Sequence, residues 1–441
     1  MDLVDSVEVD ASQRVTLQDW LGERRPSHLS TNAGTELVAF QSWRNFKEAF
    51  APELIAQAFE ETEAALGRPV RATIDPFGGS GTTALSSQFL AARPCTVEVN
   101  PYLADLIEAK LATYNPDALR TDLDAVLCAY VPFNGREPFP GAPATFVEPG
   151  VKGRYIFSRD VAEAIAGLRT AIMAVRNTDN RRLLRVVLAS ITVPVSNVVV
   201  SGKGRRYRRN WTSRKVGAAM VTAMFQRACE QAIGDILRYR NRLCLDFDLI
   251  RGDCREAIPT DQSFDVAIFS PPYPNSFDYT DVYNVELWAT GYLTTGDDNR
   301  TLRLKTLRSH VQIKRSFEAA TLNSPSLTAV AAELENVRSS LWNKAIPDMV
   351  VAYFDDMQKV LSNLFACLVG SGRAYAVVGD SRYHGVYVPV ATIITELAID
   401  IGFSKVSEEP FRSMRASPQQ GGKKELKETL LVFAKNAEGA S

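Results

Sequence analysis

A short apolar run that ends in two consecutive prolines constrains this chain more than any other feature. Residues 265–269, Asp-Val-Ala-Ile-Phe, lead directly into Ser270-Pro271-Pro272-Tyr273. The pattern predicts a buried strand that stops at a rigid turn, because each proline fixes φ and removes a backbone N–H donor. Ser270 then offers a hydroxyl and Tyr273 a flat ring at the strand's carboxyl end, the edge where open α/β sheets bind ligands. Taken alone, the tetrapeptide also fits a simple strand-ending turn or a polyproline-type docking segment.

A glycine-rich turn follows another predicted strand much earlier in the chain. Residues 71–75 predict a strand and residues 84–92 a helix, with Pro76-Phe77-Gly78-Gly79-Ser80-Gly81-Thr82-Thr83 between them. Glycines let backbone N–H groups approach a ligand closely, and the helix N-terminus adds partial positive charge. The layout suits a nucleotide-like ligand, although it matches neither the P-loop nor the G-x-G-x-x-G fingerprint.

An acidic residue stands near the end of the next predicted strand. Glu98 belongs to residues 96–100, which predict a strand. A carboxylate about 20 residues past a glycine turn suits the two hydroxyls of a ribose. A solvated strand end is the alternative interpretation of Glu98.

Bulk properties exclude several classes of protein. The 441 residues are 46% hydrophobic and 23% charged, as in an ordinary globular protein. The formal net charge of −1 argues neither for nor against an anionic partner. Six cysteines, none in a C-x-x-C arrangement, favour reduced thiols over a disulfide framework or a metal site. The acidic start lacks the features of a signal peptide, and the apolar stretch 186–200 is broken by Pro194 and too short to span a bilayer. We therefore expect a cytoplasmic protein without membrane segments.

A basic segment stands out in the middle of the chain. Residues 115–244 predict a mainly helical insertion, with helices near 160–174, 181–188 and 215–239. Residues 203–215 carry no acid, and their basic and aromatic side chains are those that a phosphate backbone and unstacked bases require. The candidate nucleic-acid contacts are Lys203, Arg205, Arg206, Arg208, Arg209, Trp211 and Arg214. A solvated charged loop is the alternative.

The predicted sheet resumes after this insertion. Residues 244–251 predict a third strand that ends in Gly252-Asp253, and the diproline strand follows it. Residues 284–345 predict a second helix-rich insertion, in which His310 has basic neighbours and is expected at the surface or against phosphate. The remaining expected elements are helices at 348–368 and 388–401 and strands at 373–379 and 428–435.

Taken together, the motifs resemble those of the S-adenosylmethionine-dependent DNA amino-methyltransferases. The matching residues are DPFGGSGTT at 75–83, Glu98, Asp253 and SPPY at 270–273; FKEAFAPEL at 46–54 and KETLLVFAK at 427–435 resemble flanking motifs of the same family. The resemblance implies an α/β fold, a Rossmann-like seven-stranded sheet with helices on both faces, plus helical insertions. Residues 1–114 and 245–441 would form the catalytic domain. The insertions 115–244 and 284–345 lie outside the resemblance, and the second is a candidate target-recognition region.

The resemblance also implies roles for the matching residues. Glu98 would hold the ribose hydroxyls and Asp253 the adenine amino group of S-adenosylmethionine, while Ser270, Pro271, Pro272 and Tyr273 would receive a base flipped out of duplex DNA. The full cofactor-binding set would be Lys47, Asp75, Phe77, Gly78, Gly79, Ser80, Gly81, Thr82, Thr83, Glu98, Asn100 and Asp253.

The residue before the two prolines bears on the target base. In this family serine is typical of N4-cytosine enzymes, whereas aspartate or asparagine is usual for N6-adenine enzymes. Ser270 therefore favours a site-specific N4-cytosine DNA methyltransferase, with a restriction nuclease as an optional partner. An N6-adenine enzyme, an RNA base methyltransferase and an inactive nucleic-acid-binding module are the alternatives. Cys95 follows Pro94 as in carbon-5 cytosine enzymes, but it lies outside the catalytic turn, and we interpret it as a buried strand residue.

Overall fold

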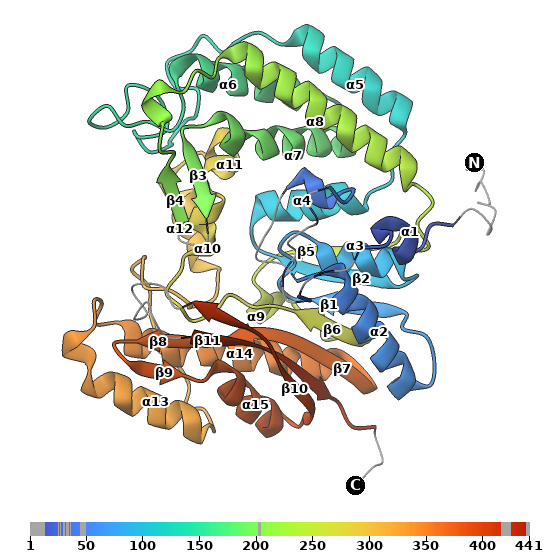
Figure 1. Ribbon diagram of the computed structural model, residues 1–441, viewed down its shortest axis with the longest axis vertical. Coiled ribbons are helices and arrows are strands. Elements are labelled where there is room, and N and C mark those ends of the chain that lie inside the picture. The colour runs from blue at the N-terminus through green and yellow to red at the C-terminus, as the bar shows by residue number, and fades with distance from the viewer. Residues whose placement is uncertain are drawn as a thin grey trace.

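The structure is a computed structural model that describes residues 14–24, 26, 28–29, 31, 35, 37–44, 50–201, 204–415 and 425–437. Its long axis runs from a layer of helices at one end to the C-terminal strands and helices at the other (Figure 1). Lys47 and Lys203, two of the predicted site residues, lie outside the described residues.

Seven strands form the main sheet, in the order β10-β11-β7-β6-β1-β2-β5. Strand β11 runs antiparallel to both of its neighbours, and the other neighbouring pairs are parallel. With helices on both faces, this order confirms the predicted Rossmann-like sheet. The strands are β1 (Ala72–Asp75), β2 (Arg93–Glu98), β5 (Asp248–Arg251), β6 (Phe264–Phe269), β7 (Leu368–Gly379), β10 (Ser404–Arg415) and β11 (Glu425–Ala434).

Strand β6 shows why the sheet has two covered faces. All six of its residues are buried, as expected for a parallel strand inside a sheet. Val266 and Ile268 join an apolar cluster with α2 (Pro52–Leu66), whereas Ala267 and Phe269 join the opposite cluster. Helices α3 (Thr82–Phe89) and α4 (Pro101–Leu111) continue the row that begins with α2, and α9 (Cys254–Ala257), α14 (Ile346–Cys367) and α15 (Val390–Ile401) cover the other face. Cys95 is 1% exposed on β2, which confirms its interpretation as a buried strand residue.

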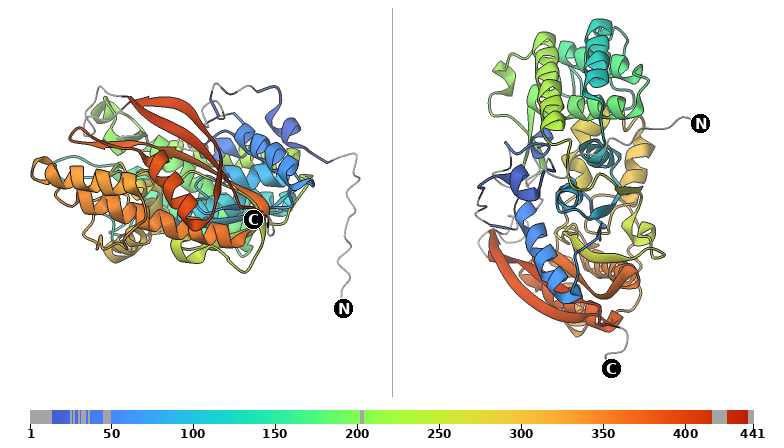
Figure 2. Two further views of the ribbon diagram at one scale, coloured as in Figure 1. Left: turned by 90° about the horizontal axis from the view of Figure 1, so that it is seen from below. Right: turned by 90° about the vertical axis from the view of Figure 1, so that its right-hand side faces the viewer.

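The insertion between α4 and β5 forms the helical layer seen at the top of Figure 1 and again in Figure 2. One continuous apolar cluster holds its helices together. They are α5 (Pro116–Ala129), α6 (Arg159–Met173), α7 (Thr178–Val195) and α8 (Ala218–Arg238), accompanied by the hairpin of β3 (Val198–Ser201) and β4 (Gly204–Tyr207) and the short η3 (Trp211–Ser213).

The second insertion is shared between the two ends of the molecule. Helix α11 (Asn284–Ala289) packs on α6 and α7, and the ring of its Trp288 lies 6.4 Å from that of Phe146. Helix α13 (Pro325–Asn336) instead packs on α14 and α15. The division of the chain into functional domains stays a prediction.

Shorter elements complete the described chain. They are α1 (Leu17–Leu21), η2 (Gln41–Trp43), α10 (Tyr279–Val282), α12 (Gly296–Leu304), η4 (Arg338–Ser340) and the hairpin of β8 (Ser381–Tyr383) and β9 (Val386–Val388). Among the described helices, none combines the length and the apolar character needed to cross a bilayer.

Candidate active site

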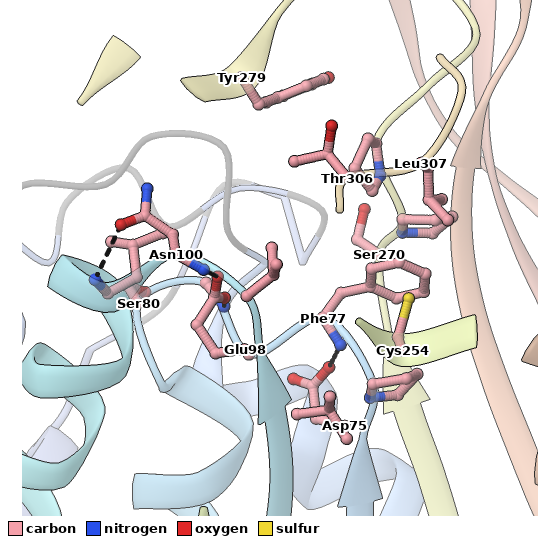
Figure 3. A pocket seen from close by; sticks show the side chains of 18 of the residues that line it. Asp75, Phe77, Ser80, Glu98, Asn100, Cys254, Ser270, Tyr279, Thr306 and Leu307 are labelled. Carbon is pink, nitrogen blue, oxygen red and sulfur yellow. Dashed lines mark hydrogen bonds between the residues drawn. The ribbon is translucent and has the colours of Figure 1, made fainter. Parts of the chain in front are cut away.

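A cavity of about 340 Å³ lies at the carboxyl ends of β1, β2 and β6. Both turns singled out in the sequence line it: the glycine turn contributes residues 76–80, Thr82 and Thr83, and the diproline turn contributes Ser270, Pro271, Pro272 and Tyr273. The volume falls within the range of roughly 300–1,000 Å³ that ligand sites occupy. Figure 3 shows Glu98 and Asn100 on one side of this cavity and Ser270 on the other.

The glycine turn needs glycine at several positions for different reasons. Gly79 and Gly81 have φ values of 53° and 78°, in the left-handed region that side chains disfavour. Gly78 has an ordinary φ, but a Cβ there would lie 2.4 Å from Cγ2 of Thr96 and 2.7 Å from Cδ1 of Ile107. The turn therefore packs directly on β2 and α4, and α3 begins beside the cavity at Thr82.

Two buried carboxylates hold the backbone of this region. Oδ1 of Asp75 accepts the N–H of Phe77 at 2.9 Å, whereas Glu98 accepts the N–H of Gly79 at 2.8 Å and that of Asn100 at 2.7 Å. Burial raises the pKa of Asp75 to about 6 and that of Glu98 to about 7. Glu98 thus ties the glycine turn to the start of α4, while both carboxylates still line the cavity.

Lys110 stabilises the glycine turn through a buried hydrogen bond, a role that the sequence did not reveal. Its Nζ, on a side chain 1% exposed, donates to the carbonyl of Ser80 at 2.6 Å and approaches Oε1 of Gln41 at 3.5 Å. Burial lowers the pKa of Lys110 to about 7. The sequence signal for this role was a lysine on the apolar face of a helix. Such a lysine is easily misread, because its long side chain usually reaches solvent.

Asp253 is placed differently from the other predicted cofactor residues. Gly252 and Cys254 line the cavity, but Asp253 itself is not among its lining residues. The Asp253 carboxylate caps α9 and forms an ion pair with Arg255, whose guanidinium also reaches Asp356. Contact between Asp253 and an adenine would require this ion pair to share or release the carboxylate.

The diproline turn is anchored on β7 and β11. Oγ of Ser270 donates to the carbonyl of Val377 on β7 at 3.0 Å, and the hydroxyl of Tyr273 donates to Oε1 of Glu428 on β11 at 2.8 Å. Burial, followed by the charge of Glu428, raises the pKa of Tyr273 well above its ordinary value. Glu428 lines the cavity as well, although its sequence context predicts only a strand residue.

Residues beyond the diproline turn close the cavity on its outer side. Tyr279 and Thr280 of α10 line it together with Thr306 and Lys305, and Figure 3 shows Tyr279 and Thr306 above Ser270. Asp278 caps α10 and forms an ion pair with Arg303. The prediction that His310 is exposed was wrong: its side chain is 1% exposed and lies 3.8 Å from Asp278, because residues 309–312 pack against Ser276 beside the turn.

Residues 204–207 of the basic segment form strand β4, which pairs with β3; we call β3, β4 and the residues 208–215 that follow them the β3–β4 hairpin. The β-branched run 198–200 before a Ser-Gly-Lys-Gly sequence was the signal for it. Of its described arginines, Arg208 and Arg214 turn inward and donate to carbonyls of residues 193–196 at the end of α7.

The outward side of this hairpin stands near the cavity. Arg205, Arg206 and Arg209 are exposed, and Trp211 is half-buried with its ring 5.6 Å from that of Tyr155. Strand β4 packs on α10, the helix whose Tyr279 lines the cavity. The structure therefore brings this hairpin close to the diproline turn, although 62 residues separate Tyr207 from Ser270 along the chain.

The seven-stranded sheet of this order, with helices on both faces, has the architecture of a Rossmann-like methyltransferase fold, and its glycine turn and diproline turn line one cavity. No protein-family profile matches the chain. The Type II methyltransferase M.BsoBI from Geobacillus stearothermophilus is 24% identical over an alignment of 455 positions, which covers 90% of this chain and 86% of that protein. The Type II methyltransferase M.AvaI from Nostoc sp. is 25% identical over an alignment of 464 positions, which covers 93% of this chain and 91% of that protein.

These relatives confirm the resemblance to DNA methyltransferases that the motifs predicted, and S-adenosylmethionine is the methyl donor of the class. Alignments that span nine-tenths of the chain also run through both insertions, which the motif resemblance had left outside. Among solved structures, an rRNA methyltransferase, aviRa from Streptomyces viridochromogenes, matches 88% of this chain and 85% of its own at 11% identity, with a TM-score of 0.27.

Proposed function

We propose that this protein transfers a methyl group from S-adenosylmethionine to N4 of a cytosine flipped out of duplex DNA, at a specific sequence, as in restriction–modification. The observation that carries the proposal is the single cavity lined by both the glycine turn and the Ser270-Pro271-Pro272-Tyr273 turn. The similarity to Type II methyltransferases supports site-specific DNA as the substrate. A restriction nuclease would then be the natural partner.

The residues of the glycine side fit the cofactor. Backbone N–H groups at the start of α3 suit its carboxylate, and the Glu98 carboxylate at the cavity wall suits ribose hydroxyls. When bound there, the cofactor supplies an electrophilic methyl group on a sulfonium. Phe77 and Cys254 add apolar surface to the same wall. Asp253 reaches the adenine in this proposal only if it shares its carboxylate with Arg255.

Ser270 is oriented to act as a hydrogen-bond acceptor. Because its hydroxyl proton is donated to the carbonyl of Val377, its lone pairs remain for an amine N–H. The lone pair of an exocyclic amine is delocalised into its ring, so hydrogen bonds that favour a pyramidal nitrogen increase its reactivity. Tyr273 and Tyr279 provide rings at this wall for the flipped base, and alignment of the two reactants supplies much of the rate.

The exposed side of the β3–β4 hairpin suits the DNA backbone. Arg205, Arg206 and Arg209 present charge next to α10, so a duplex lying on them would place a flipped base near the cavity. Arg208 and Arg214 have a structural role instead, since they satisfy carbonyls at the end of α7.

Sequencing of modified bases in a host that expresses the protein tests the proposal. We expect N4-methylcytosine at one recurring sequence, and a much smaller modified fraction of those sites in a host that expresses the Ser270→Ala variant. N6-methyladenine alone would favour the sister class of enzyme. Methyl transfer to tRNA but not to duplex DNA would favour an RNA enzyme, and failure to bind S-adenosylmethionine in calorimetry would favour an inactive module.

A further inference from the structure

Glu428 lies in the cavity beside the diproline turn, although it is far from that turn along the chain. Strand β11 is antiparallel to β7, and Glu428 pairs with Gly379, the last residue of β7. The start of β11 therefore lies at the carboxyl edge of the parallel strands, where ligands bind in such sheets. Glu428 is 3% exposed and lines the cavity beside the diproline turn.

Three carboxylates line the cavity among the described residues, and they serve different sides of it. Asp75 and Glu98 hold backbone N–H groups of the glycine side. Glu428 instead accepts the hydroxyl of Tyr273 and so belongs to the side of Ser270. It is the cavity carboxylate attached to the turn that receives the amine in the proposed function.

After an amine is methylated, one of its N–H protons must be released. When the nitrogen lone pair forms the bond to the methyl carbon, the carbon–sulfur bond breaks with its electrons on sulfur, and the nitrogen becomes positively charged. One N–H proton is then released to restore the neutral methylamine. Ser270 is a poor base for that proton, because a neutral hydroxyl is only weakly basic: its lone pairs can accept a hydrogen bond from the amine but cannot take up the proton.

We propose that Glu428 is a catalytic residue, which stabilises the charge that develops on the target amine and accepts the proton released by methyl transfer. The inference rests on the proposed function. A carboxylate has two oxygens and about four acceptor positions, so the Tyr273 hydroxyl and an amine N–H can share it. Tyr273 then has two roles: its ring meets the base, and its hydroxyl fixes the Glu428 carboxylate toward the turn.

The test measures single-turnover methylation of the duplex identified by base sequencing, at saturating S-adenosylmethionine. We expect Glu428→Gln to lower the rate by about 100-fold or more, the usual contribution of a positioned acid or base. Tyr273→Phe, which keeps the ring and the carboxylate, should lower it less than about tenfold. The cofactor dissociation constant of Glu428→Gln should stay within about twofold of wild type, since an amide of the same shape replaces the carboxylate.

Two controls keep the inference separate from folding and from the proposed function. Glu409→Gln, at an exposed position of β10, should leave the rate unchanged. A Glu428→Gln rate within about threefold of wild type would overturn the inference while leaving the enzyme's activity intact. Equal losses in Glu428→Gln and Tyr273→Phe, with no further loss in the double variant, would also overturn it, because Glu428 would then act only through Tyr273. Absence of methyl transfer by the wild type would instead contradict the proposed function.

Discussion

The ring of Phe77 in the glycine turn lies 5.9 Å from the ring of Phe269, the residue immediately before Ser270. A second link joins the same two motifs, because Oγ1 of Thr83 approaches the carbonyl of Ile268 at 3.4 Å. Adjacent pairing of β1 with β6 brings these segments together. The glycine turn and the diproline turn are therefore held at one fixed spacing by the sheet itself.

Replacement of the residues of the diproline turn should separate chemistry from cofactor binding. We expect Ser270→Ala to lower turnover by about 100-fold, by analogy with the loss of one preorganised hydrogen-bonding group, and Tyr273→Ala to lower it by orders of magnitude. Cofactor affinity, measured by calorimetry, should survive in both. Near-normal turnover in both variants would remove the turn from the mechanism.

A methyl group added at Gly78 should disturb the glycine turn. Because a Cβ there would meet Thr96 and Ile107 at 2.4 and 2.7 Å, Gly78→Ala should cost about 1–3 kcal/mol of unfolding free energy and weaken cofactor binding. The matched control is Gly234→Ala in α8, where nothing lies within 4 Å, and which should stabilise by up to about 1 kcal/mol. Urea denaturation that ranks the two variants in the opposite order would refute the packing argument.

Stability without cofactor should depend on pH through Glu98. Burial raises its pKa from 4.5 to about 7, so the folded protein binds more protons than the unfolded chain between these values. The stabilisation is present below about pH 4.5 and is lost as pH rises through 7, on the order of 3 kcal/mol. Asp75, with its pKa raised to about 6, acts with the same sign. Glu98→Gln should therefore lose less unfolding free energy between pH 5 and 8 than wild type does; equal losses would exclude Glu98 as the source.

The arginines of the β3–β4 hairpin should divide into two groups. Replacing Arg205, Arg206 and Arg209 by glutamine should weaken DNA binding and reduce the slope of log affinity against log salt by about 2 to 3, if each contacts a phosphate. Replacing Arg208 and Arg214 should instead lower the unfolding temperature, because carbonyls at the end of α7 lose their donors. A salt slope that is unchanged in the first group would remove the hairpin from the DNA interface.

The sequence predicted the parts of the site that depend on local pattern. The glycine turn, the strand ahead of Ser270 and the acid at Glu98 each follow from residue types over a few positions, and the structure places all three at one cavity. Some strand limits shifted by a few residues, as for β2, which was predicted at 96–100 and observed at Arg93–Glu98, because strand ends depend on pairing partners.

The parts that were missed depend on contacts between distant segments. Glu428 meets Tyr273 across 155 positions, and Lys110 meets Ser80 through the packing of α4 on the turn. The two roles of the hairpin arginines depend on which side of β4 and η3 faces α7, and a run of basic residues gives no sign of this. His310 was misplaced for the same reason, since its burial follows from the path of residues 309–312 beside Ser276.

The central claim is that one cavity brings an exocyclic amine to the methyl donor. The direct measurement is incubation of the purified protein with methyl-tritiated S-adenosylmethionine and unmethylated duplex DNA, followed by digestion to nucleosides. We predict label in N4-methyldeoxycytidine, incorporated about 100-fold more slowly with Ser270→Ala. Label that appears only on a ring carbon, or a wild-type protein that binds the cofactor and leaves the DNA unlabelled, would contradict the account.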